Sequence, residues 1–338
     1  MRLPRSRGPV SEQVLALLGG QGSDRQVDDI TVEVDPRRPG GPDVLADADV
    51  QLALWCLYEL HYRGFDDVAP ELEWDPRVIA TRNRLEAAFE RDVRRAVQDR
   101  LDAVADDDEA DVADQVTALI DADDSPSLAA FVRRYATADQ VLAFLRQRSI
   151  YHLKESDPHA FVVPRIDGAA KVALAELQYD EFGGGRVPAL HATLFGDALE
   201  ACGLDRTYGA YLDDADATTL AVNNLMSLFG LNRRLRGAAM GHLAVFEATS
   251  SLPSRKIAAG VRRLGLPEEL AGYYDEHVEA DAVHEQLALR NICGSLVAED
   301  PALRADVLLG AAACLELDAR AGAEQLEQWG AAPQAASA

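Results

Sequence analysis

Apolar residues recur every three or four positions along most of this chain, and this spacing constrains the fold more than any other feature of the sequence. From Asp47 onward the spacing fits α-helices, while stretches with the two-residue alternation of β-strands are absent or short. Several expected helices begin near a proline, which the first helical turn tolerates, as at Pro188, Pro267 and Pro301. The sequence therefore predicts an all-α protein.

The helical pattern divides the chain into unequal parts. Residues 1–45 are rich in Arg, Pro, Gly and Asp with weak periodicity, so a loose arm is expected there. A helical region over residues 46–145, suited to packing or dimerisation, precedes a core at residues 146–330, and residues 331–338 are expected to form a disordered tail. Helices are expected at 49–62, 75–102, 128–135, 139–154, 169–182, 188–202, 217–228, 233–250, 254–264, 267–292 and 301–329.

The segment from Leu101 to Val132 contains ten acidic and no basic residues. Such a charge run is typical of solvated helices, here a pair broken at Ser125 and Pro126. The alternative is an acidic patch that buffers metal or binds a partner. The sequence favours the solvated helices.

Charge and cysteine usage limit the partners and location of the protein. Its 33 Lys and Arg against 57 Asp and Glu give a formal charge of −24, which repels phosphate backbones and argues against nucleic-acid binding. The longest apolar runs are too short to span a bilayer, and residues 1–20 do not resemble a signal peptide. A cytoplasmic protein without membrane or nucleic-acid partners is expected. The four cysteines fit neither a disulfide framework nor a zinc site: Cys56, Cys202, Cys293 and Cys314.

Three potential metal ligands share one expected helix. His277, Asp281 and His284 are separated by four and three residues, so their side chains project from one stripe of the helix. Imidazole and carboxylate groups held this way can chelate a transition metal, because the helix fixes their separation. The alternative is a solvent-facing stripe that contains two histidines by chance, and the spacing alone does not decide between the two.

A second constellation lies upstream, where one helix ends and the next begins. Glu181 is followed by the three glycines 183–185, which let the chain turn sharply, and Pro188 restarts the helix that carries His191. Glu181 and His191 are therefore candidates to face one cavity. Taken singly, Glu181 is better interpreted as a charge on an exposed helix end and His191 as a core histidine.

A third carboxylate is needed to complete such a site, and the residues leave its identity open among Glu155, Glu176 and Glu247. Carboxylates and histidines without thiolates suit iron or manganese better than structural zinc. Ferritin-like diiron bundles carry Glu-x-x-His motifs, and none of the seven histidines here has Glu three positions before it. A ferritin-type bundle is therefore disfavoured.

The order of these residues resembles that in the haem-oxygenase-like diiron oxidases and oxygenases, a group also described as iron-containing redox enzymes. The resemblance rests on Glu155, on Glu181 followed by His191, and on His277-x3-Asp281-x2-His284. The flanking segments 59–65 and 178–185 are similar to the actinobacterial-type branch of that family, and the likeness covers roughly residues 50–330. It implies a haem-oxygenase-like helical bundle with extra N-terminal helices, binding iron without porphyrin.

The resemblance also implies a ligand set and a chemistry. Two Fe(II)/Fe(III) ions, bridged by carboxylates, would reduce the co-substrate O2 through a peroxo-diferric intermediate to oxidise a small amine- or carboxylate-containing substrate, by N-oxygenation, desaturation or C–C cleavage. Arg186, Arg290 and Lys154 lie near the ligands in sequence and are candidate anchors for a carboxylate, although a surface or salt-bridge role is the preferred interpretation of each. The implied ligands are Glu155, Glu181, His191, His277, Asp281 and His284.

The remaining polar residues of interest are read as follows. Glu247 lies in an apolar helical stretch, where it is either an extra ligand, a partner that orients a histidine, or a buried acid bonded to backbone. Tyr179 and Tyr274 are read as packing residues. Structural or surface roles are expected for the other four histidines: His61, His152, His159 and His242.

Two other functions are compatible with a helical chain of this kind. One is a metal-free enzyme on the same fold, either a thiaminase-like hydrolase or a cofactorless oxidase, since one fold hosts different chemistries. The hydrolase would need a nucleophilic cysteine beside an acid–base partner, and no cysteine has one nearby in sequence. The other is a non-catalytic interaction protein whose acidic run binds a basic partner. Because all six ligand positions are filled, the diiron interpretation is preferred.

Overall fold

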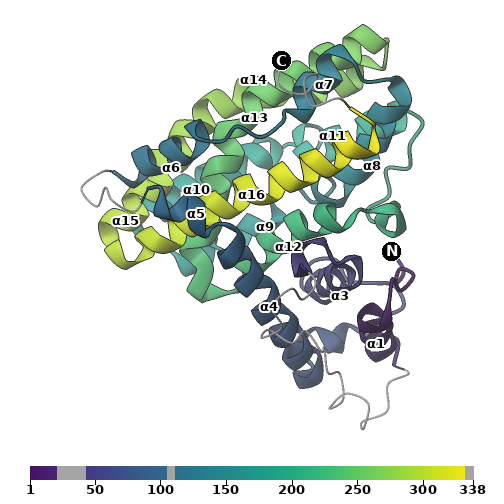
Figure 1. Ribbon diagram of the computed structural model, residues 1–338, viewed down its shortest axis with the longest axis vertical. Helices are drawn as coiled ribbons and strands as arrows, with labels where there is room; N and C mark the ends of the chain where they lie inside the picture. The colour runs from purple at the N-terminus through teal and green to yellow at the C-terminus, as the bar shows by residue number, and fades with distance from the viewer. Residues whose placement is uncertain (21–42, 105–110, 332–338) are drawn as a thin grey trace.

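The computed structural model describes residues 1–20, 43–104 and 111–331, apart from the side chains of residues 279–283, and it is helical almost throughout (Figure 1). No β-strand occurs in these ranges, which confirms the predicted all-α fold class. The N-terminal helices are α1 (Pro9–Leu18), α3 (Ala48–Glu59), α4 (Pro76–Ala96), α5 (Gln98–Asp102), α6 (Val112–Asp121) and α7 (Leu128–Arg134). The helices of the core are α8 (Ala138–His152), α9 (Asp157–Ala160), α10 (Gly168–Glu181), α11 (His191–Ala201), α12 (Ala217–Leu231), α13 (Arg236–Leu264), α14 (Glu268–Gln286), α15 (Ser295–Glu299) and α16 (Arg304–Gln328), with a π-helix at Leu287–Gly294 between α14 and α15.

Side-chain caps explain where several helices begin. Asp47 accepts hydrogen bonds from the N–H groups of Asp49 and Val50 at the start of α3. Thr137 and Gln140 form a reciprocal capping box at the start of α8. Such caps satisfy N–H groups that the helix itself leaves without partners.

The long helix α13 is the centre of the bundle. Helices α14, α16 and α7 pack along it, while α12 packs on both α16 and α3. Gly241 of α13 and Gly310 of α16 lie directly against the backbone of the opposite helix, at the carbonyl groups of Val307 and Ala238. A larger residue at either position would force the two helices apart.

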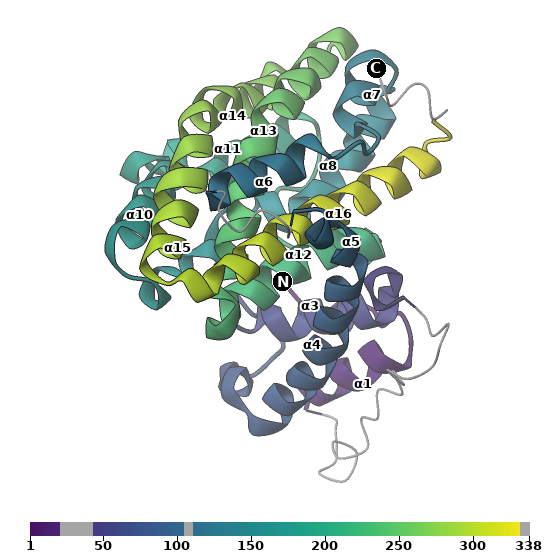
Figure 2. The same cartoon turned by 60° about the vertical axis from the view of Figure 1, so that its left-hand side comes forward.

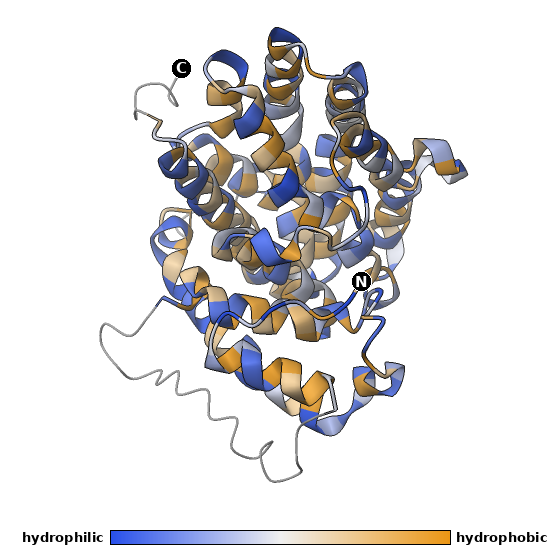
Figure 3. Ribbon diagram, turned by 90° about the vertical axis from the view of Figure 1, so that its right-hand side faces the viewer, coloured by the Kyte–Doolittle hydropathy of each residue, from blue (hydrophilic) through white to orange (hydrophobic). Residues whose placement is uncertain are grey.

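The N-terminal helices α1, α3 and α4 form a separate layer below α12 (Figure 2). Hydrophobic and hydrophilic residues share most helices (Figure 3), as expected for amphipathic helices around a core. Helix α3 is an exception, since ten of its residues are buried between α1, α4 and α12. No helix among the described residues is long and apolar enough to cross a membrane.

Two differences from the expected element boundaries depend on packing between helices. Residues 9–18, placed in the expected loose arm, form α1, because Val14, Leu17 and Leu18 are buried against α3. The expected break before Ser254 is absent, and α13 continues through Pro253. Packing on α14 and α16 compensates for the one helical hydrogen bond that proline removes. The rest of the arm, residues 21–42, and the tail, residues 332–338, lie outside the described residues.

Candidate metal centre

Five of the six predicted ligands come together in the interior of the bundle. Glu155 follows α8, Glu181 ends α10, His191 begins α11, and His277 and His284 lie on α14. All five side chains are buried. The sixth, Asp281, lies outside the residues whose side chains the structure describes.

The first cluster consists of Glu155, His191 and His277. One potential ligand atom of each lies within 4.8 Å of the others. The Nε2 atom of His277 is 3.5 Å from Glu155 Oε1, and the rings of His191 and His277 are 4.7 Å apart. Because Nδ1 of His277 is 2.8 Å from the backbone oxygen of Tyr273 and donates to it, Nε2 carries the lone pair that can bind a metal.

The second cluster consists of Glu181, Glu247 and His284, again with ligand atoms within 4.8 Å of one another. Nδ1 of His284 lies 3.3 Å from Glu247 Oε2 and 3.6 Å from Glu181 Oε1. Its Nε2 lies 3.4 Å from Asp180 Oδ2, a geometry in which Nε2 donates and Nδ1 is left for a metal.

Glu181 connects the two clusters. One oxygen, Oε2, lies 3.2 Å from Nδ1 of His191 in the first cluster, while Oε1 faces His284 in the second. A carboxylate with one oxygen turned to each cluster has the arrangement of a bridging ligand.

The turn between α10 and α11 forms as its glycines predict. Gly183, Gly184 and Gly185 all have positive φ, at 70°, 60° and 76°. At Gly183 a Cβ would lie 2.5 Å from the backbone of Ala189 and Leu190. The tight turn therefore brings Glu181 and His191 to within 3.2 Å of each other.

The structure separates the three carboxylates that the sequence left open. Glu155 and Glu247 both face the cavity, whereas Glu176 is exposed on α10. Glu247 therefore belongs with the potential ligands, since it reaches His284 from α13. The position of Glu247 beside His284 depends on the packing of α13 against α14, which no local sequence motif predicts.

Two further residues, His152 and Tyr273, contact Glu155, and the sequence did not predict this contact. Nδ1 of His152 lies 2.9 Å from Glu155 Oε1, and the Tyr273 hydroxyl lies 2.9 Å from Glu155 Oε2 and 2.6 Å from His152 Nδ1. Both side chains orient Glu155. Their spacing was the available signal, because His152 precedes Glu155 by three residues and Tyr273 precedes His277 by four.

The charges of the centre suit a cation. Burial alone would raise the pKa of Glu155, but His152 and His277 outweigh burial and hold that pKa well below its usual range. Burial would lower the pKa of His284, but Glu247 and Glu181 outweigh it and raise the pKa to about 9. The carboxylates of the site therefore stabilise a proton on the neighbouring histidines. A metal cation would take the place of that proton.

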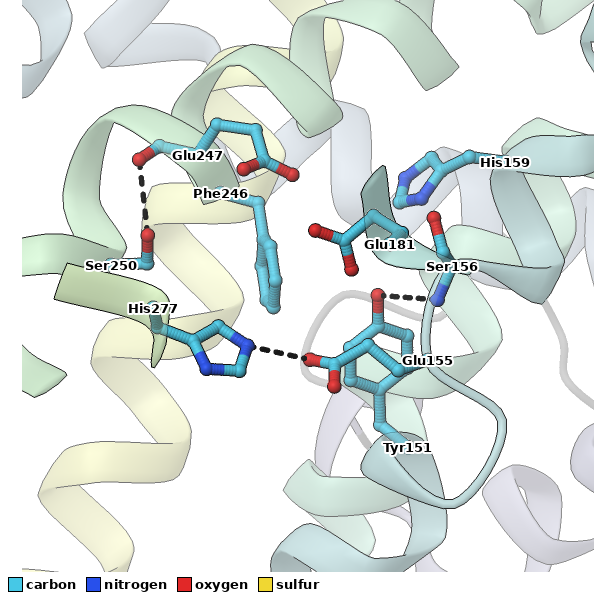
Figure 4. Close-up of a pocket in the computed structure, with 9 residues that line it drawn as sticks. All are labelled: Tyr151, Glu155, Ser156, His159, Glu181, Phe246, Glu247, Ser250 and His277. Atoms are coloured by element: carbon cyan, nitrogen blue, oxygen red, sulfur yellow. Dashed lines mark hydrogen bonds and ion pairs between the residues drawn. The ribbon is translucent and has the colours of Figure 1, made fainter. Parts of the chain in front are cut away.

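A cavity of about 10 Å³ lies between the clusters (Figure 4), close to the smallest that holds one water molecule. None of the three basic residues considered as anchors lines it. Arg186 is exposed, Arg290 is exposed beside Asp111 and Asp114, and Lys154 pairs with Glu59. The cavity is lined by Tyr151, Glu155, Ser156, His159, Glu181, Phe246, Glu247, Ser250 and His277.

The donor set fits iron. Three imidazoles and three carboxylates are gathered in a buried site, and none of the four cysteines lines the cavity. Oxygen and nitrogen ligands of this kind suit iron and disfavour structural zinc. The fold and the site together define an all-α protein with a buried histidine–carboxylate site that could hold a metal ion.

Comparison with known families agrees with this class. The sequence model of the family described as iron-containing redox enzyme, which is haem-oxygenase-like, matches residues 142–319, somewhat more than half of the chain. The chain belongs to this family, as its sequence resemblance predicted, and its bundle is haem-oxygenase-like. Among curated proteins, none matches the chain.

Proposed function

We propose that this protein is a non-haem diiron oxidase or oxygenase that activates O2 to oxidise a small amine- or carboxylate-containing substrate. The observation that carries the proposal is Glu181, whose two carboxylate oxygens face histidines of two separate buried clusters. Two metal positions joined by a carboxylate are what a dinuclear centre needs.

Each described ligand has a distinct part in this proposal. Glu155, His191 and His277 would hold one iron, and Glu247 and His284 the other, with Glu181 between them. Bound iron would supply the electron transfer to O2 that the side chains cannot perform themselves.

The protein's own contribution is orientation and exclusion of water. Tyr273 and His152 hold Glu155, the Tyr273 carbonyl fixes the ring of His277, and Asp180 faces the outer nitrogen of His284. Burial of all these ligands keeps bulk water away from the reacting atoms. The small cavity between the clusters has room for about one water-sized group.

No observation favours the metal-free alternative. A thiaminase-like hydrolase needs an activated cysteine, and burial raises the pKa values of Cys56 and Cys293 and leaves both in the core, away from the cavity lining.

The test is an anaerobic Fe(II) titration followed by exposure to O2, with Mössbauer and visible absorption spectroscopy. We expect two irons per chain in the wild type and at most one in Glu181→Ala. The matched control is Glu176→Ala, which removes an exposed carboxylate from the same helix and should retain both irons. Equal iron uptake by both variants, or none by the wild type, would contradict the proposal.

A further inference from the structure

His159 is a buried histidine that the ligand clusters do not use. Its side chain is only 2% exposed, and neither ring nitrogen has a hydrogen-bond partner among the described residues. The ring nevertheless lines the cavity between the two clusters, and in Figure 4 it lies on the side of Glu181 and Ser156, across from Ser250.

An unusual backbone conformation places this ring. Ser156 has φ 68° and ψ −15°, the left-handed region, and it alone among the described non-glycine residues has positive φ. Such a conformation is unfavourable for a residue other than glycine and persists only where the surrounding structure enforces it. It turns the chain directly from Glu155 into α9, which carries His159. Gly230 of α12 lets the Pro158 carbonyl approach closely and fixes α9 from the other side.

Tyr151 supplies a second neutral group to the same cavity. Its hydroxyl oxygen accepts a hydrogen bond from the Ser156 N–H at 3.3 Å, and no acceptor for its own hydrogen occurs among the described residues. Burial raises the pKa of this phenol well above its usual value, so the hydrogen is retained. Tyr151 is therefore a donor whose hydrogen is available to a molecule in the cavity.

Burying an imidazole without partners is unfavourable. A buried polar group without a hydrogen bond is destabilising, whereas phenylalanine would occupy similar space without that penalty. Burial also lowers the pKa of His159 to about 4, so near neutral pH the ring carries one donor and one acceptor. Its hydrogen bonds are completed only when a polar molecule occupies the cavity.

We propose that His159 and Tyr151 form a subsite that hydrogen-bonds one polar atom of a small dipolar or anionic molecule held between the two ligand clusters. The inference rests on the proposed diiron function, because bound cations would offset the charge of Glu155, Glu181 and Glu247 around such a guest. The cavity of about 10 Å³ has room for about one such atom.

His242 provides a matched control within the chain. It is 1% exposed, its Nδ1 atom also has no hydrogen-bond partner among the described residues, and its ring lies 5.8 Å from that of His159. Unlike His159, it does not line the cavity. The two histidines thus share chemistry and burial and differ in access to the guest.

The experiment measures azide binding to iron-loaded, air-oxidised protein by the change in visible absorption, with iron content and thermal unfolding recorded for every variant. We expect His159→Phe to weaken azide binding about tenfold with iron content unchanged, since tenfold corresponds to about 1.4 kcal/mol, the scale of one hydrogen bond. His159→Gln, which keeps a donor and an acceptor, should recover most of the affinity. Tyr151→Phe should weaken binding by a smaller factor, and His242→Phe should leave it within about twofold.

Two results would overturn the subsite. One is unchanged azide affinity in His159→Phe with full iron content, which leaves the diiron function standing. The other is equal weakening in His159→Phe and His242→Phe, which would assign the effect to packing. A wild type that takes up no iron would remove the proposed function and this inference with it.

Discussion

Two adjacent residues, Lys154 and Glu155, enter buried polar regions of opposite character. Lys154, 3% exposed, lies 3.4 Å from Glu59 Oε2, with its ammonium group 4.1 Å from the ring centre of Tyr62. Glu59 also accepts hydrogen bonds from the Tyr208 hydroxyl at 2.6 Å and from the Arg63 N–H at 3.2 Å. Lys154 and Glu59 therefore neutralise each other's charge inside the protein.

The region around Glu155 is different, because its carboxylates outnumber its obligatory cations. Glu155, Glu181 and Glu247 meet three histidines that are cationic only when protonated, and among the described residues no lysine or arginine lines the cavity. A buried charge must be paired or bind a metal. The comparison teaches that the Lys154 side is complete within the protein, whereas the Glu155 side has the carboxylates that the proposed metal ions would neutralise.

The largest effect on folding is expected from breaking the self-compensated pair. Glu59→Ala leaves Lys154 buried without its counter-charge and should lower the free energy of unfolding by about 3–5 kcal/mol. Urea denaturation of the metal-free protein measures this.

The matched control replaces both charges. Glu59→Leu combined with Lys154→Met should recover most of the lost stability, since replacing a buried ion pair by apolar side chains is often neutral. If the double variant is as unstable as Glu59→Ala, packing and not the unpaired charge is responsible.

At the candidate metal centre we expect the opposite result, a small effect on stability and a large effect on iron binding. Glu247→Gln should change the free energy of unfolding of the metal-free protein by less than about 1 kcal/mol, because it leaves Glu181 to face His284. Iron affinity should fall by about 100-fold, or about 2.7 kcal/mol, because a ligand is lost. Parallel urea denaturation and competitive iron titration check both parts, and a stability loss as large as that of Glu59→Ala would break the comparison.

The sequence predicts those features of the site that residues close together in the chain determine. The joint placement of Glu181 and His191 is local, because three glycines and a proline determine the turn between them. His277 and His284 share a helical face by spacing alone. The all-α class was likewise accessible from periodicity.

Other features of the site depend on packing between distant segments. The sequence left the role of Glu247 open among three alternatives, and Glu247 reaches His284 only because α13 packs along α14. Tyr273 meets His152 across more than a hundred residues of chain. Proline removes one helical hydrogen bond, so Pro253 predicts a helix end, yet α13, packed against α14 and α16, continues through that position. The burial of α1 against α3 is another tertiary contact, and the composition of residues 1–45 does not predict it.

A third kind of buried polar group extends the comparison, because among the described residues His159 and His242 have neither a carboxylate partner nor a place in a ligand cluster. Burial lowers the pKa of His242 to about 3, below the ordinary value of about 6.5, so the unfolded chain binds this proton more readily than the folded protein. The stability that depends on neutral His242 is therefore complete above about pH 6.5 and is lost as the pH falls toward 3, with a slope of up to about 1.4 kcal/mol per pH unit. His242→Phe has no proton to take up at this position, so its stability should decline less steeply between pH 6.5 and 4 than that of the wild type. Urea denaturation of the two metal-free proteins across this range measures the difference, and because the carboxylates titrate in both, parallel curves would mean that folding does not keep His242 neutral.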